Sequence, residues 1–119
     1  MTIERIVDAL DARIFTGQSL LSHDVQAACG CDLMSDVLAF GKENMVLLTG
    51  LINLHSVRTA DMLDCRCIVF VRGKTPSPDM IELAEERDIA LLATEHTLYV
   101  ACGMLYQLGL PSDAQANTP

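Results

Sequence analysis

Hydrophobic and polar positions follow two periods along this chain, and the changes of period separate its elements. Three short apolar runs, centred on Leu47, Val69 and Leu91, recur at equal intervals, and each is followed by a polar turn and a helical pattern. Apolar runs without a polar side are typical of strands that are covered on both faces. Because the turns differ between the three units, the pattern predicts a small α/β sheet rather than a solenoid.

The clearest unit is a predicted strand, helix and strand at residues 67–71, 78–87 and 89–93. Ser77 can accept hydrogen bonds from the first free amides of this helix, and Pro78 suits its first position. Strands joined through one helix are expected to be parallel, with a right-handed crossover. The remaining predictions are strands at 13–16, 25–31 and 45–49, helices that begin at Thr2 and at Asp32 or Ser35, and helices at 53–63 and 98–108.

Composition narrows the classes of partner and compartment. The 119 residues suffice for one domain with a single core. The 16 acidic residues outnumber the 8 basic ones, the net charge is −8, and the basic residues are scattered. Because phosphate-rich polymers and anionic membranes bind clustered cations, neither nucleic acid nor membrane is expected as a partner. No apolar run approaches the roughly 18 residues of a membrane span, and the chain starts with a helical pattern rather than a signal peptide, so a cytoplasmic location is expected.

Polar side chains gather where the predicted parallel strands end. In open parallel sheets the carboxyl ends of the strands lie on one edge, and ligands bind outside that edge. Hydroxyls, a guanidinium and helix amino ends can together bind a small anion such as phosphate. The alternative is that the same side chains only cap helices and close turns, which every helix start requires. This set, called the strand-end rim below, consists of Thr49, Asn53, His55, Arg72, Gly73, Thr94 and His96.

The five cysteines suggest an alternative chemistry. An odd number of cysteines within strand-like segments fits reduced, buried thiols better than a disulfide framework. Cys29 and Cys31 form one Cys-x-Cys pair, and Cys65 and Cys67 form another. Four thiolates could hold zinc or an iron–sulfur cluster, although alternate residues of a strand make a cramped pair of ligands. We therefore expect no metal and no cofactor, and keep a metal or redox protein that uses these four cysteines as the alternative.

No arrangement of residues predicts catalysis. The string Gly73-Lys74-Thr75 ends like a nucleotide-binding phosphate loop, but that motif requires glycine where this chain has Ile68 in mid-strand. Ser22-His23-Asp24 are adjacent in sequence, whereas the members of a catalytic triad come together in space. The chain is accordingly expected not to be an enzyme, and a small enzyme that uses His55 or His96 is a further alternative.

A longer stretch is similar to a known family. Residues 72–92, RGKTPSPDMIELAEERDIALL, resemble the second half of a DRTGG domain, and are also similar to the amino-terminal, non-catalytic domain of HPr kinase/phosphorylase. Residues 32–39, DLMSDVLA, resemble the start of the second helix of that family. The resemblance extends over approximately residues 3–110. It implies a mixed sheet, a regulatory role without activity, dimerisation and, for short members, a genomic link to iron-hydrogenase subunits.

Pattern and resemblance together predict one α/β domain at residues 1–110, with a mixed, mostly parallel sheet of about five strands flanked by helices. The small, polar residues 111–119 are predicted to form a disordered tail. The predicted function is a non-enzymatic regulatory or interaction module, homodimeric, that senses a small anionic ligand such as a nucleotide or phosphometabolite, or binds a protein partner. A link to iron-hydrogenase systems follows from the resemblance alone.

Overall fold

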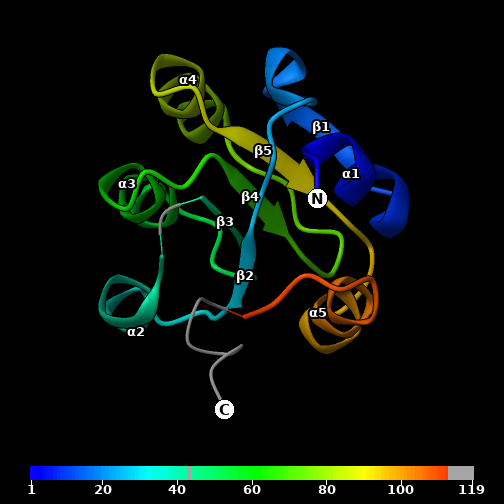
Figure 1. Cartoon of the computed structure of the whole chain (residues 1–119). Helices are drawn as coiled ribbons and strands as arrows, with labels where there is room; N and C mark the ends of the chain where they lie inside the picture. Colours follow the sequence, from blue (N-terminus) through cyan, green and yellow to red (C-terminus); the bar gives the residue numbers. More distant parts are fainter. Residues whose placement is uncertain (43, 113–119) are drawn as a thin grey trace.

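Five strands form one sheet in the spatial order β1-β5-β4-β3-β2 (Figure 1). The computed structural model describes residues 1–42 and 44–112, so the tail predicted at 111–119 lies outside the described residues from position 113 onward. Strands β2 to β5 are parallel, and β1 pairs antiparallel with β5, which confirms the mixed, mostly parallel sheet. The strand bounds are β1 Arg13–Thr16, β2 Ala27–Gly30, β3 Met45–Thr49, β4 Cys67–Phe70 and β5 Ala90–Ala93.

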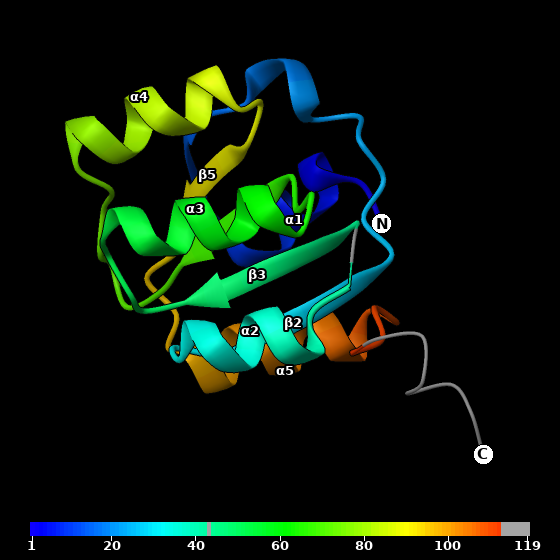
Figure 2. The same ribbon diagram turned by 90° about the vertical axis from the view of Figure 1, so that its left-hand side faces the viewer.

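The helices divide between the two faces of the sheet. Helices α2, α3 and α4 cover one face, and α1 and α5 cover the other (Figures 1 and 2). None of the helices in the described part of the chain is long and apolar enough to span a membrane. The helix bounds are α1 Ile3–Leu10, α2 Met34–Phe40, α3 Leu54–Met62, α4 Pro78–Glu86 and α5 Leu98–Gln107, and a short 3-10 helix lies at Gln18–Leu20.

Side-chain caps explain where most of these helices begin. The Thr2 hydroxyl accepts a hydrogen bond from the Arg5 amide at 3.2 Å, and the Ser77 hydroxyl accepts one from Met80 at 3.3 Å. The prediction that Asp32 or Ser35 starts the second helix is wrong. That helix begins at Met34 after Leu33 and has no side-chain cap, because the Asp32 carboxylate bonds to a neighbouring strand end instead.

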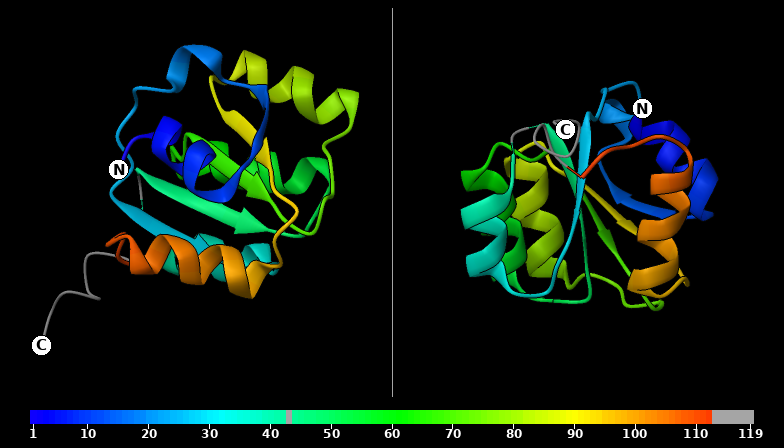
Figure 3. Two further views of the ribbon diagram at one scale, coloured as in Figure 1. Left: turned by 90° about the vertical axis from the view of Figure 1, so that its right-hand side faces the viewer. Right: turned by 60° about the horizontal axis from the view of Figure 1, so that its bottom comes forward.

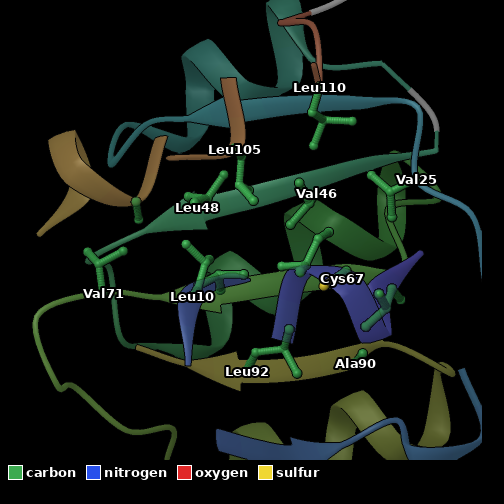
Figure 4. Close-up of a cluster of buried hydrophobic side chains, with 14 residues drawn as sticks. Leu10, Val25, Val46, Leu48, Cys67, Val71, Ala90, Leu92, Leu105 and Leu110 are labelled. Atoms are coloured by element: carbon green, nitrogen blue, oxygen red, sulfur yellow. The ribbon is translucent and has the colours of Figure 1, made fainter. Parts of the chain in front are cut away.

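Two apolar cores, one on each face, hold the layers together, so the single core expected from the chain length is wrong. Along each parallel strand successive side chains point to opposite faces, so a continuous apolar run serves both cores. Leu48 and Leu92 pack with Leu10 of α1 and Leu105 of α5 in the cluster shown in Figure 4. Leu47 and its neighbours on β4 and β5 pack against α2, α3 and α4. This double use explains why β3, β4 and β5 show no polar side in the sequence.

Candidate functional site

The carboxyl ends of β2 to β5 meet at one edge of the sheet, as the parallel pairing requires. The loops after β2, β3 and β4 lead to helices on one face, whereas the loop after β5 leads to α5 on the other face (Figure 3). Two neighbouring strands whose loops diverge to opposite faces form the crevice in which α/β sheets bind ligands. Topology therefore directs attention to the junction between the ends of β4 and β5.

At this junction the two loops are hydrogen-bonded to each other. The Arg72 amide donates to the His96 carbonyl at 2.8 Å, and the Gly73 amide donates to the Thr94 carbonyl at 2.9 Å. Both amides are thus already used within the chain. The turn places Arg72 and Gly73 in the left-handed region, with φ of 62° and 71°. That conformation is costly for an arginine, and it leaves the Arg72 side chain exposed at the junction.

A carboxylate lies beside the same turn. A Cβ atom placed on Gly73 would come 2.7 Å from Oε2 of Glu95, so glycine makes room for this side chain. Glu95 itself is exposed. The junction therefore carries a negative group next to the arginine, and a ligand anion would meet both charges.

The end of β3 carries a second polar cluster that centres on Asp32. One oxygen of its carboxylate, Oδ1, accepts hydrogen bonds from the Gly50 amide at 2.7 Å and from the Thr49 hydroxyl at 3.0 Å. The ammonium of Lys74 donates to the Gly50 carbonyl at 3.0 Å. Asp32 thus occupies the position in which an external anion could have met the Gly50 amide. Lys74 joins this cluster to the β4 turn.

The structure divides the seven residues of the predicted rim into two groups. Thr49 and Thr94 are 0% and 2% exposed. The Thr94 hydroxyl donates to the Leu10 carbonyl at 2.8 Å, and the Thr49 hydroxyl donates to Asp32 at 3.0 Å, so both hydroxyls have partners within the fold. Asn53 caps α3, because its side-chain oxygen accepts from the His55 amide at 2.8 Å. The accessible members are Asn53, His55 and Arg72, which are exposed, and Gly73 and His96, which are half-buried.

Sequence reasoning missed Asp32 and gave too little weight to Lys74 and Glu95. Asp32 follows the carboxyl end of β2 by two positions, so the rule applied to the other three strands would have placed it on the rim. Its local sequence favours a helix cap instead. Only the pairing of β2 with β3 shows that its partners are Thr49 and Gly50.

The four cysteines of the two Cys-x-Cys pairs do not share one side of the sheet. Cys29, Cys31 and Cys65 belong to the core beneath α2, α3 and α4, whereas Cys67 belongs to the core on the opposite face. Burial raises the pKa of Cys65 to about 11, and burial together with the neighbouring Cys65 raises the pKa of Cys67 well above its ordinary value. Within residues 1–42 and 44–112, no three histidine, cysteine, aspartate or glutamate side chains are grouped to hold a metal ion. This geometry gives no support to the four-thiolate alternative.

Comparison with known proteins adds evidence on the fold. No family model and no curated protein matches the sequence. Among solved structures, the chain is similar to the CBS and DRTGG domains of the regulatory region of the Clostridium perfringens pyrophosphatase, complexed with its activator diadenosine tetraphosphate. The TM-score is 0.70 at 20% identity, over 94% of this chain and 48% of the other. The fold is DRTGG-like. This chain spans about half the length of that DRTGG-containing structure, and at this identity the likeness shows the fold alone.

Proposed function

We propose that this chain is a regulatory module without catalytic activity, and that it binds a small anionic ligand at the junction of β4 and β5. The observation that carries this function is the exposed Arg72, held in a left-handed turn where the loops of two parallel strands diverge. Among the described residues, the other four non-glycine residues with positive φ are Asp or Asn, which tolerate this conformation better than arginine does. Strained non-glycine residues cluster at functional sites. The similar regulatory region contains an activator that is a polyphosphate nucleotide, which is a ligand of the same charge class.

The geometry also indicates how such an anion would be held. The amides of Gly50, Arg72 and Gly73 already have partners within the chain, so side chains must supply the binding. The planar guanidinium of Arg72 can bind a phosphate with two parallel hydrogen bonds. The Lys74 ammonium uses one of its three donors on Gly50 and keeps the others for a ligand. Binding should therefore weaken as salt is added, because screening reduces the attraction between the anion and these two cations.

The histidines favour this interpretation over the enzyme alternative. Within the described residues, neither the imidazole of His55 nor that of His96 is hydrogen-bonded to a carboxylate or a hydroxyl. A general base needs a group that orients it and fixes its tautomer. The module is proposed to act by a change of binding state, as a cytoplasmic homodimer with a small ligand or a protein partner. The iron-hydrogenase link rests only on the sequence resemblance and belongs to the same proposal.

A ligand-binding titration with a glycine variant tests the function. Thermal unfolding is measured with ATP, ADP, diadenosine tetraphosphate, acetyl phosphate and inorganic phosphate, in wild type, Arg72→Gly and Arg5→Ala. Arg5 is the control because it is an exposed arginine near the start of α1, where it lines a hollow with Leu108 rather than with the rim residues. At least one phosphate compound is expected to raise the unfolding temperature of wild type and Arg5→Ala, and to leave Arg72→Gly unchanged. The absence of a shift with every compound would reject the ligand and leave only an interaction role.

A further inference from the structure

Most of the exposed apolar side chains belong to the two helices that flank the edge strand β2 or adjoin these helices. Within the described residues, eight large hydrophobic side chains are exposed, and seven of them belong to α2, to α5 or to the residues that adjoin these helices. Helices α2 and α5 flank β2 on its two sides, as Figures 2 and 3 show. The term β2-edge face is used below for this surface, which comprises β2 with Leu33, Leu38, Phe40, Tyr99, Val100 and Tyr106.

An open hollow of about 670 Å³ lies on the α5 side of this face. Its walls come from Ala28 and Gly30 of β2, and from α5 residues that include Tyr99, Gly103 and Tyr106. Helix α5 sits close to the strand here, because a Cβ on Gly30 would come 2.4 Å from the Cys102 sulfur. The half-buried Cys102 packs against the core cluster of α1 and α5 and also lines the hollow. The face is therefore apolar and concave.

The outer side of α5 alternates large and small residues. Tyr99 and Tyr106, the only tyrosines of the chain, are 89% and 72% exposed and stand two helical turns apart. Gly103 lies between them, and a Cβ placed there would meet nothing within 4 Å. The packing of a single copy does not require glycine at this position, and glycine weakens a helix interior relative to alanine. The exposed side of the helix therefore has a depression at Gly103, with the protruding side chains of Tyr99 and Tyr106 on either side of it.

Charge selects the occupant of this face. Helix α5 has no charged residue, while α4 on the other side of the molecule carries Asp79, Glu82, Glu85 and Glu86. Two copies with a net charge of −8 each repel one another over most of their surfaces. The uncharged helix α5 lets them approach at this part of the face without opposing carboxylates, whereas a basic partner would find no opposite charge on α5. Protruding side chains and a depression on the same helix can fit those of a second copy, and a two-fold contact requires such a self-complementary surface.

We propose that the β2-edge face is the surface through which two copies of this chain associate. Helix α5 of one copy packs antiparallel on α5 of the other about a two-fold axis near Gly103, and Tyr99 of each copy meets Tyr106 of its partner. The inference rests on the interaction role within the proposed function. It is independent of ligand binding, because the β4–β5 junction lies at the ends of the strands and the face lies along the sheet's edge.

Association is measured on the full chain by light scattering and sedimentation over a wide range of concentrations. Tyr106→Glu is compared with Met62→Glu, whose side chain is also 72% exposed but lies on α3 outside the face. Wild type and Met62→Glu are expected to be dimers, and Tyr106→Glu is expected to weaken dimerisation at least about tenfold, since it brings two carboxylates into the apolar contact. A wild type that stays monomeric, a Tyr106→Glu dimer as tight as wild type, or equal disruption by Met62→Glu would each overturn the proposal.

Gly103→Ala separates association from folding. Alanine favours the helix, so the variant should unfold at a higher temperature than wild type when both are diluted to monomers. The same methyl groups crowd the two-fold contact, so its dimer should dissociate more readily than that of wild type. An equally tight or tighter dimer would contradict packing at Gly103. Ligand shifts that persist in a monomeric Tyr106→Glu would show that the rim functions whatever the fate of this face.

Discussion

The strand-end rim and the β2-edge face lie at two borders of one sheet. They differ in whether their side chains have partners within the fold. At the rim, most polar groups have hydrogen-bond partners within the chain. The Asp32 carboxylate accepts from the Gly50 amide, and the Thr94 hydroxyl donates to the Leu10 carbonyl. At the face, large apolar groups such as Tyr99 and Tyr106 are left exposed. A side chain whose partners lie within the fold is poor evidence for a ligand. A side chain that the fold leaves exposed and without such partners requires another explanation.

By this criterion each region retains one informative feature. At the rim it is Arg72, whose left-handed backbone costs stability and whose guanidinium has no ion pair with any described residue. At the face it is Gly103, a helix-interior glycine beside open space. In both places the chain retains a residue that a lone, unliganded copy would fold better without.

The largest expected effect is a loss of folding stability at alkaline pH, because buried thiols lie in the cores on both faces of the sheet. The ordinary thiol pKa is 9.0, and burial raises that of Cys65 to about 11. Between these values the unfolded chain loses the Cys65 proton while the folded chain keeps it, so the free energy of unfolding falls as the pH rises. At about 1.4 kcal/mol per pH unit, this thiol alone accounts for a loss of about 2 to 3 kcal/mol.

Urea unfolding at pH values from 9.0 to about 11 measures this loss. Cys65→Ala is expected to be less stable than wild type at neutral pH and to show a shallower fall in alkali, with the remainder due to Cys67. Cys31→Ala is the control, because the Cys31 thiol is only half-buried. Parallel pH curves for wild type and Cys65→Ala would contradict the assignment.

Thr94→Val tests whether the buried part of the rim serves the fold. Valine keeps the size of threonine but leaves the Leu10 carbonyl without its 2.8 Å hydrogen bond. An unsatisfied buried acceptor costs about 1 to 3 kcal/mol, which a urea midpoint detects. Thr75→Val, at an exposed position in the β4–α4 loop, should change stability little. Thr94→Ser should restore most of the loss, and a Thr94→Val protein as stable as wild type would return this hydroxyl to the list of candidate ligand contacts.

Much of the fold, and little of the candidate site, could be predicted from the sequence. The apolar runs around Leu47, Val69 and Leu91 determine three buried strands because local pattern and burial coincide there. Asp32 has the local chemistry of a helix cap, yet its partners lie 17 and 18 residues ahead on another strand end. Thr94 appears accessible until its partner is seen 84 residues away. Long-range hydrogen bonds of this kind leave no periodic signal.

The exposed face was hidden for a different reason. Helix α5 is apolar on nearly all sides in sequence, so periodicity cannot tell the buried Ala101 and Leu105 from the exposed Tyr99 and Tyr106. Only the position of β2 at the edge of the sheet, where Pro111 rather than another strand bonds to Ala28, decides which side of α5 is left exposed. Strand order is a property of the whole fold, and single-sequence patterns do not contain it.

Gly30→Ala tests how tightly α5 is seated on β2, with a smaller expected effect. The new methyl group would come 2.4 Å from the Cys102 sulfur, which must then rotate toward the hollow. Because the sulfur can move, we expect a loss of about 1 kcal/mol, at the low end for overpacking. In a Cys102→Ala background the clash is absent, and the same substitution should cost nothing or stabilise the strand. Equal losses in both backgrounds, measured by urea unfolding, would show that the sulfur is not the obstacle.

The smallest expected change, and the most informative one at the rim, is a gain of stability in Arg72→Gly. Glycine adopts a φ of 62° without strain, so the variant should be more stable by about 0.5 to 1 kcal/mol. Asp88→Gly, at a φ of 55° in the turn after α4, is the matched control for relief of strain away from the rim. Both variants should gain stability, but only Arg72→Gly should lose the thermal shift with phosphate compounds. If both variants kept the shift, the strain at Arg72 would be a feature of the turn alone, and the rim would have no group left over for a ligand.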